Sequence, residues 1–398
     1  MSQSMLIINA GIPHPNRGAS VVLFYHYIKH LHAAGYNILN LLLIDKQHFG
    51  EAALTEYRTK HAPQENFQIE AYLHDQPLIH RSRFNITSNF PEELYEQIKG
   101  FQADIIVCFD TIPAWFAAKI PAEKKVVWLG DLHFQTEWHH ALYAIRENPR
   151  QVTGIPFVWR SCSQWRQIYR EALQDFTVVV SSKSSEQHMA ALRIQAQYLP
   201  YPWPNEDVVT EYNPRKTPTF LFFGSLVGLD SHSAFHFMIK KVYPELVKLW
   251  GTGGFKIYIT GMRQMPGWAR DAIAALPEFE FLGFVDNLED LLANCHAVMV
   301  PIRVPVGNRS RIVTAMAKGI PIVAHVNTRL GNPDLEDGVN CFLANNGRDF
   351  AKKMQRLYVD AELRQRIIIA AKDCYNRKFA PQTATSFLID IIKDKTRV

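Results

Sequence analysis

The sequence predicts an α/β protein of two domains, each built around a doubly wound parallel sheet. Three observations support this fold class. The length of 398 residues exceeds the size at which a single hydrophobic core stops growing. Short apolar runs alternate with helical patterns in two successive arrays, as they do in α/β folds. A proline-rich stretch separates the two arrays, and 47% apolar against 20% charged residues is typical of a globular protein.

The first array opens with a strand–loop–helix–strand unit. The apolar run 5–9 leads into the loop AGIPHPNRGAS and then into a helical pattern that ends at Gly35, a residue type that commonly ends helices. A second apolar run, 38–44, follows this helix. A unit of this size predicts that the two strands pair in parallel through a right-handed crossover.

The remainder of the first array repeats this pattern less regularly. Central parallel strands are expected at DIIVCFD (104–110), KVVWLGD (125–131) and FTVVVSS (176–182). A helix with a serine N-cap is expected to begin near Ser184. The stretch 134–175, which is rich in Trp, His and Arg, is expected to be helical as well.

The second array follows a linker and repeats the alternation. Five prolines between positions 200 and 218 predict the linker, because proline cannot continue a helix or a central strand. A helix is then expected over 234–250. Strands are expected at TFLFFGS, FKIYITG, FEFLGFV, HAVMVPI and IPIVAHV. The apolar spacing within 381–398 predicts a terminal helix that must bury one face.

These patterns give the expected domain boundaries. We expect an N-terminal domain at 1–203, a C-terminal domain at 204–380, and a last helix at 381–398 that packs back on the N-terminal domain. Ligands of open α/β sheets bind outside the carboxyl ends of the strands. The loops that follow the predicted strands are therefore the places to look for a site.

The strongest motif is PIRVPVGNRSRIVTAMAKGIPIVAH at 301–325. A strand ends at Pro301, a loop leads to a helix at 312–318, and Gly319 ends that helix. A helix N-terminus offers unpaired N–H groups and a partial positive charge, which suit a diphosphate. Arginine side chains add charge-assisted bonds to phosphate oxygens. The candidate ligand contacts in this loop are Gly307, Asn308, Arg309, Ser310 and Arg311.

This block resembles the nucleotide-sugar-binding signature of GT-B glycosyltransferases, in family 4 and the group 1-like families. The signature has a glycine-rich loop with Arg and Lys, a Glu-Ala helix, a Gly and a Pro-Val-Val strand. Here Arg309 and Arg311 occupy the basic positions, and they should meet the donor diphosphate. Thr314 and Val306 occupy the positions of the usual Glu pair, so that Thr314 can offer only a hydroxyl to the donor. The resemblance implies two Rossmann-like domains facing each other across a cleft, joined by a C-terminal crossover helix.

The resemblance extends over about 170 residues of the C-terminal half. FFGSLVGLDSHS is similar to the first strand and turn of the family's donor domain, YITGM to its second strand end, and GFVDNLEDLL to the segment that covers the nucleobase. It implies further donor-binding positions at Gly224, Ser225, Gly261, Arg263, Val285, Asp286 and Asn287.

The N-terminal half carries the expected acceptor site. Asp131 and His133 follow a predicted strand end in GDLHFQTEWHH, where His133 would orient an acceptor hydroxyl or the transferred sugar, or simply satisfy a loop carbonyl. Arg17 and Gly18 resemble the family's N-terminal loop on the acceptor side. That loop matches neither GxGxxG nor GxxxxGK[ST], which argues against nicotinamide and ATP. His139 and His140 lack the spacing of metal ligands.

The predicted reaction moves a sugar from a UDP- or GDP-linked donor to an acceptor hydroxyl on a glycan, a lipid-linked or a small-molecule acceptor. Arg309, Arg311 and the helix N-terminus would stabilise charge on the leaving diphosphate. The resemblance implies retention of anomeric configuration, with no bound metal and no further cofactor. Two alternatives remain open. One is a non-catalytic GT-B subunit that binds a nucleotide or glycan, and the other is a nucleotide-sugar epimerase.

Charge and cysteine content narrow the setting. The net charge of +5 suits a phosphate-bearing ligand or an anionic membrane surface and is too small to indicate nucleic acid. The five cysteines form no CxxC pair and are expected to be buried thiols in a reducing compartment. No secretory leader or stretch of about 18 apolar residues is evident. We expect a cytoplasmic protein, peripheral to the inner face of a membrane, whose oligomeric state the sequence leaves open.

Overall fold

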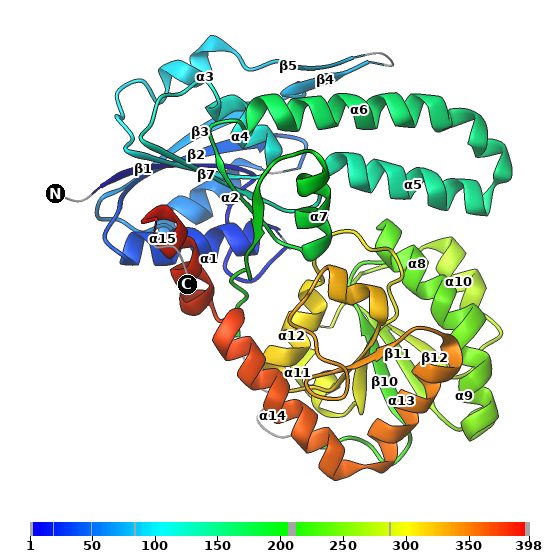
Figure 1. The fold of residues 1–398 in the computed structure, drawn as a ribbon. Coiled ribbons are helices and arrows are strands. Elements are labelled where there is room, and N and C mark those ends of the chain that lie inside the picture. The colour runs from blue at the N-terminus through cyan, green and yellow to red at the C-terminus, as the bar shows by residue number, and fades with distance from the viewer. Residues whose placement is uncertain are drawn as a thin grey trace. The chain divides into compact units, whose positions relative to one another are not determined.

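The computed structural model describes residues 3–18, 20–48, 50–82, 85–205, 212–285 and 288–394. The chain divides into two compact units: an N-terminal unit of Met1–Pro204 with Pro381–Val398, and a C-terminal unit of Asn205–Ala380. Each unit holds its own parallel sheet with helices packed on it (Figure 1). This confirms the predicted α/β class with two doubly wound sheets.

The N-terminal unit is built on a seven-stranded parallel sheet with the order β3-β2-β1-β6-β7-β8-β9. Its strands are β1 (Ser4–Ala10), β2 (Asn37–Asp45), β3 (Phe67–His74), β6 (Ile105–Phe109), β7 (Lys124–Leu129), β8 (Thr177–Val180) and β9 (Ala196–Tyr198). A separate antiparallel pair is formed by β4 (Ile79–Arg81) and β5 (Ile86–Ser88). The strand order reverses between β1 and β6, so the loops that follow these two strands diverge and leave room for a ligand.

The helices of this unit include a long helical hairpin. The expected helical stretch 134–175 forms α5 (His133–Glu147), the 3₁₀ turn η2 (Pro149–Gly154) and α6 (Ile155–Ala172). The break falls at Asn148 and Pro149, where the Asn148 side chain accepts a hydrogen bond from the Arg150 N–H. The two helices run side by side, and their connecting end projects away from the sheet (Figure 1).

The other helical segments of the N-terminal unit cover its sheet. They are α1 (Ser20–Ala33), α2 (Glu51–Glu56), the π turn η1 (Tyr57–His61), α3 (Glu92–Glu96), α4 (Thr111–Ala117), α7 (Lys183–Ala191) and α15 (Pro381–Ile392). The terminal helix α15 packs on α1, and Ala384 and Leu388 on its inner face are buried. The serine cap expected before α7 is Ser182, whose hydroxyl accepts from the Ser185 N–H at 3.0 Å.

The C-terminal unit is built on a six-stranded parallel sheet with the order β12-β11-β10-β13-β14-β15. Its strands are β10 (Thr219–Phe223), β11 (Lys256–Thr260), β12 (Phe279–Gly283), β13 (Ala297–Val300), β14 (Ile322–His325) and β15 (Phe342–Ala344). Its helical segments are α8 (Leu229–Phe237), the π turn η3 (Met238–Val242), α9 (Tyr243–Trp250), α10 (Gly267–Ile273), α11 (Leu288–Ala293), α12 (Ser310–Lys318), the 3₁₀ turn η4 (Val326–Leu330), α13 (Gly347–Val359) and α14 (Ala361–Lys378). Here the order reverses between β10 and β13.

Two helices of this unit differ from the sequence expectation. The helix expected over 234–250 begins earlier, at Leu229, and passes through a π turn before α9. Pro244 explains the π turn, because it has no N–H to donate to the preceding turn. The helix expected over 312–318 begins at Ser310, so that Ser310 and Arg311 belong to the first turn of α12. This brings both residues to a helix N-terminus.

The cores consist of the strands and the inner helix faces. Trp128, Tyr27 and Phe109 form an aromatic cluster in the N-terminal core, and Phe220, Phe222 and Phe235 are buried in the core of the other unit. All five cysteines are buried and free of disulfides, as expected from the sequence. Within the described ranges no helix is long and apolar enough to cross a membrane.

Candidate donor and acceptor sites

The candidate donor site lies at the carboxyl edge of the C-terminal sheet, where the strand order reverses. The loop after β10 begins with Gly224, and the loop after β13 runs over 301–309 into α12. The side chain of Arg309, the N-cap residue of α12, does not cap this helix. The N–H groups of Ser310 and Arg311 are therefore left for a ligand, at the point where α/β sheets bind phosphates.

Two glycines bring the strand ends of β10 and β11 into close contact. Gly224 has φ +112° and Gly261 has φ +110°, a backbone conformation that side chains rarely allow. A Cβ on Gly261 would lie 2.6 Å from the Gly224 nitrogen. The Gly224 N–H donates to the Thr260 carbonyl at 3.0 Å and is therefore engaged within the sheet. The two glycines shape the floor of the site.

The guanidinium of Arg311 lies directly over this floor. A Cβ on Gly224 would stand 3.0 Å from Nη2 of Arg311, and the guanidinium carbon is 5.4 Å from the centre of the Phe222 ring. Nη1 is buried and has no hydrogen-bond partner among the described residues. Burial lowers the pKa of Arg311 to about 10, although Asp230 opposes the shift. A buried cation with an unused donor is a group that an anionic ligand would satisfy.

Arg309 is held differently from Arg311. Its Nη1 lies 2.7 Å from the Asp230 carboxylate, and its Nη2 donates to the Val304 carbonyl at 2.7 Å. Its backbone N–H donates to Oδ1 of Asn332 at 2.9 Å. The side chain is 5% exposed. Arg309 thus ties the loop after β13 to the first turn of α8, and this leaves Arg311 as the less neutralised of the two arginines.

The other expected donor residues surround these arginines in the same unit. Gly307 is buried with φ +66°, and its carbonyl oxygen would be 2.2 Å from a Cβ on Gly331. The carbonyl of Asn308 accepts from Arg309 at 3.0 Å. Thr314 is half-buried on α12, whereas Val306 is only 3% exposed. A residue buried to this degree presents no surface to a ribose.

The remaining expected donor residues lie on the neighbouring loops. Ser225 is exposed after β10, where its hydroxyl accepts from the Val227 N–H at 3.2 Å. Arg263 is exposed after β11, and Val285 is half-buried after β12. Asp286 and Asn287, which were expected at the same turn as Val285, lie outside the described residues.

The first candidate acceptor pocket lies in the N-terminal unit, at the carboxyl end of β1. Arg17 and Gly18 line a pocket of about 410 Å³, together with His14, Glu56 and His61. The ring of His61 lies 3.8 Å from the Glu56 carboxylate. Burial, His61 and Arg17 lower the pKa of His14, and Glu56 opposes them. The loop that was expected on the acceptor side therefore forms a concave surface with titratable groups.

The strand across the reversal point, β6, ends in a strained residue. Asp110 has φ +82°, and its carboxylate accepts from the Thr111 N–H at 2.8 Å as the N-cap of α4. The Thr111 hydroxyl donates to the Tyr169 hydroxyl at 2.8 Å. A non-glycine residue in this conformation costs about 1–3 kcal/mol and occurs mainly at functional sites. Asp110 therefore joins the candidate acceptor residues.

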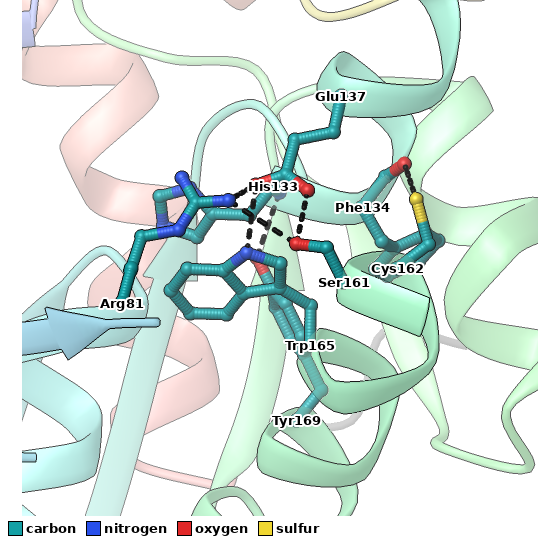
Figure 2. A network of polar contacts seen from close by, with 8 residues as sticks. All are labelled: Arg81, His133, Phe134, Glu137, Ser161, Cys162, Trp165 and Tyr169. Atoms are coloured by element: carbon teal, nitrogen blue, oxygen red, sulfur yellow. Dashed lines mark hydrogen bonds and ion pairs between the residues drawn. The ribbon is translucent and has the colours of Figure 1, made fainter. Parts of the chain in front are cut away.

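His133 begins α5 and stacks on Trp165. The two rings are 4.1 Å apart and inclined by 18°, and the His133 N–H donates to the Tyr169 hydroxyl at 3.2 Å (Figure 2). Burial lowers the pKa of His133, while the carboxylates of Asp110 and Glu137 oppose the shift. The imidazole is thus neutral near pH 7 and able to accept a proton or a hydrogen bond. Asp131 is exposed on the loop between β7 and α5.

Glu137 organises the surroundings of His133. Its carboxylate accepts from Trp165 Nε1 at 2.9 Å and from the Ser161 hydroxyl at 2.6 Å, and it pairs with Arg81 (Figure 2). These bonds fix the plane of Trp165 on which His133 stacks. Glu137 is therefore a positioning residue for His133.

The sequence expectations did not include Asp230, Asp110, Glu137 or Arg81. Glu137 follows His133 by four residues, and because α5 begins at His133 this spacing places both on one face of the helix. Asp230 follows the glycine-containing turn after β10, where a carboxylate suits a helix N-terminus. No sequence pattern indicates the positive φ of Asp110 or the approach of Arg81 from a distant hairpin. In the described part of the chain, His, Cys, Asp and Glu form no cluster suited to a metal ion.

The two parallel sheets, their reversal points and the loop–helix site at α12 are features of the GT-B fold. Residues 217–360 match the family model described as Glycosyl transferases group 1. The C-terminal unit therefore carries a group 1 glycosyltransferase domain, as the sequence predicted. No curated protein matches the chain in sequence.

Solved structures share the fold over nearly the full chain. HepE from Anabaena, solved in complex with UDP, is 14% identical with a TM-score of 0.66, covering 99% of this chain and 100% of that chain. A glycosyltransferase from Rickettsia africae is 14% identical with a TM-score of 0.69, covering 99% and 98%. A TarM variant from S. aureus, solved with UDP among its ligands, is 10% identical with a TM-score of 0.67, covering 98% and 99%. The structural likeness establishes the fold, whereas identities this low leave the substrates open.

Proposed function

We propose that this glycosyltransferase uses a UDP-sugar as donor and binds its diphosphate at the N-terminus of α12. The observation that carries the proposal is the buried guanidinium of Arg311 over Gly224, with Nη1 unpartnered among the described residues. The choice of uridine over guanosine is supported by the UDP found in the HepE and TarM structures.

The donor site would act on the leaving group. Breaking the bond between sugar and diphosphate builds negative charge on the diphosphate, and preorganised donors stabilise that charge. Arg311 and the N–H groups of Ser310 and Arg311 supply them in this proposal, with Gly307 and Asn308 lining the approach. Arg309 contributes by holding the loop through Asp230. Ser225, Arg263, Val285, Asp286, Asn287 and Thr314 complete the proposed donor contacts.

The N-terminal unit would bind the acceptor. The neutral imidazole of His133 can accept a hydrogen bond from an acceptor hydroxyl, and Asp110 and Asp131 can orient neighbouring hydroxyls. Arg17 and Gly18 line the pocket after β1. We propose that transfer retains the anomeric configuration. We also propose that it needs no bound metal, because Arg311 and the helix N-terminus already supply positive charge at the leaving group. We also propose a cytoplasmic site of action.

The test is a thermal-shift panel with UDP, GDP, ADP and CMP on the full chain, followed by titration calorimetry with the preferred nucleotide. Ligand binding to the native state raises the melting temperature by mass action. We expect UDP to give the largest shift and Arg311→Met to weaken UDP binding at least tenfold. Arg377→Met is the control, because Arg377 is exposed on α14 and pairs only with Asp373 among the described residues. UDP affinity that is equal in both variants would refute the proposed phosphate contact.

One observation favours a second candidate, a GT-B subunit that binds a nucleotide without transfer. Val306 is buried and Thr314 carries no carboxylate, so the two usual acidic positions offer no charge to the donor. Release of UDP from a panel of UDP-sugars separates the two functions. Transferase function predicts release that depends on an acceptor, whereas UDP binding without release from any donor identifies the binding subunit.

A further inference from the structure

A cavity opens in the N-terminal unit between the α5–α6 hairpin and the end of β4. Its volume is about 690 Å³, within the usual range of ligand pockets. Arg81 contributes to its wall from β4, Glu137 and Ala144 from α5, and Phe157 and Ser161 from α6. The cavity therefore shares Arg81, Glu137 and Ser161 with the network around His133 (Figure 2).

The cavity has one polar end. Arg81 pairs with Glu137 and donates to the Ser161 hydroxyl at 3.1 Å, and all these bonds use Nη2. Among the described residues, Nη1 and Nε of Arg81 have no hydrogen-bond partner. The Arg81 side chain is 52% exposed. Its free edge can therefore bind an anion with two parallel hydrogen bonds.

Apolar side chains form much of the rest of the cavity lining. Ile155, Phe157 and Val158 from α6 contribute to it together with Ala141 and Ala144 from α5. Phe157 is a large apolar side chain that is 41% exposed. A ligand that fits this apolar lining needs an alkyl portion, and one that also fits the polar end needs an anionic group as well.

The end of the helical hairpin carries further exposed apolar side chains, which lie outside the cavity lining. Leu142, Val152 and Trp159 are 44%, 55% and 62% exposed. The segment 138–167 contains four arginines, of which Arg146, Arg150 and Arg160 are exposed, and one acidic residue, Glu147. Exposed Trp and aliphatic side chains beside arginines are the combination that binds an anionic bilayer surface.

We propose that this cavity binds a membrane lipid with an anionic headgroup, with the alkyl chain along Ile155, Phe157 and Val158 and the headgroup at Arg81. The hairpin end at 142–159 rests on the bilayer from which the lipid comes. The lipid would be the acceptor of the sugar, and in that respect the proposal rests on the proposed function. Binding of the lipid is measured without a sugar donor, so the two proposals can fail separately.

The first test is calorimetry with decyl phosphate below its micelle concentration, with decanol and inorganic phosphate as partial ligands. We expect one decyl phosphate per chain, weaker binding of decanol, and no measurable binding of phosphate alone. Arg81→Gln should weaken decyl phosphate at least fivefold with little effect on decanol, and Phe157→Ser should weaken both. Arg377→Gln is the control for lost charge and should bind as the native protein does.

Two outcomes of this test would overturn the cavity assignment. One is decyl phosphate binding that Arg81→Gln and Phe157→Ser leave unchanged. The other is the absence of binding by the folded native protein. If the cavity binds decyl phosphate as expected while donor binding fails, the lipid site stands and the donor proposal falls.

The second test distinguishes a bilayer source from a soluble amphiphile. Vesicles of phosphatidylcholine and phosphatidylglycerol at 3:1 should sediment the protein, and pure phosphatidylcholine vesicles should sediment much less. Trp159→Ser should reduce binding severalfold. Ile369→Ser is the matched control, because Ile369 is 60% exposed on α14, outside the hairpin. Equal loss in both variants, or decyl phosphate binding without vesicle binding, would refute the bilayer source.

Discussion

Arg309 and Asp230 form an ion pair at 2.7 Å that joins the loop after β13 to the first turn of α8. The Arg309 side chain is 5% exposed and that of Asp230 32%. The Asp230 carboxylate also raises the pKa of Arg311, which opposes the lowering caused by burial. One carboxylate therefore balances two arginines, and the second of them retains charge for a ligand.

Asp230→Asn tests this balance. The substitution leaves the Arg309 guanidinium buried with only carbonyl partners, and unpaired buried charge is costly. Because Asp230 is partly exposed, we expect a loss of about 1–3 kcal/mol in the free energy of unfolding. Urea denaturation measures it. Asp373→Asn, which removes an exposed ion pair on α14, is the control and should cost under about 1 kcal/mol. Equal losses in the two variants would contradict a structural role for Asp230.

Gly224→Ala tests the contact between β10 and Arg311. The new Cβ would lie 3.0 Å from Nη2 and must displace the guanidinium. We expect UDP affinity to fall at least tenfold, about 1.4 kcal/mol. Gly251→Ala is the matched control, because Gly251 has φ +74° in open space and so carries the backbone cost of about 1–2 kcal/mol without the clash. Calorimetry with UDP compares the two. Unchanged affinity in Gly224→Ala would show that the position of Arg311 does not matter to the nucleotide.

The repeated units of the fold were readable from the sequence because buried parallel strands leave apolar runs. The runs at 5–9, 38–44 and 104–110 correspond to β1, β2 and β6. The shorter or half-exposed strands left no such signal. β3 contains no fully buried residue, and β9 has three residues. A search for continuous apolar runs does not identify strands of this kind.

The candidate site could be predicted from the sequence only where its residues are contiguous in the chain. The loop 301–309 and the start of α12 are contiguous, so the arginines and glycines were found together. Pairings between distant segments were not. Nothing local shows that Asp230 neutralises Arg309, or that Arg81 reaches Glu137 from 56 residues away. The roles of the two arginines differ for this reason, although their sequence context is the same.

Glu137→Gln tests whether Glu137 tunes His133. The Glu137 carboxylate raises the pKa of His133 against the effect of burial, so its neutralisation should lower that pKa further. An NMR titration that follows the His133 ring signal measures the shift. Glu171→Gln removes the same charge from an exposed position on α6 and should leave the His133 signal unchanged. A His133 pKa that rises, or that moves equally in both variants, would contradict the arrangement.

The last prediction concerns His325, which is the last residue of β14 and caps η4. Its ring nitrogen Nδ1 accepts from the Asn327 N–H at 3.2 Å, and burial together with Arg303 lowers the pKa of His325 to about 4. The pKa of an unfolded histidine is about 6.5. As the pH falls, His325 therefore binds a proton in the unfolded state while it is still neutral in the folded state. The free energy of unfolding is therefore unaffected by the titration of His325 above about pH 6.5. It decreases as the pH falls toward 4, by at most about 1.4 kcal/mol per pH unit.

His325→Asn separates this titration from the rest of the chain. Asparagine is a good N-cap and should still accept from the Asn327 N–H, but it takes up no proton. Urea denaturation at pH 7 and pH 5 should therefore show a smaller loss of stability in the variant than in the native protein. His48→Asn makes the same replacement at an exposed histidine and is the control for the loss of a histidine elsewhere in the chain. If His325→Asn loses as much stability between these pH values as the native protein, the buried neutral state of His325 does not contribute to acid sensitivity.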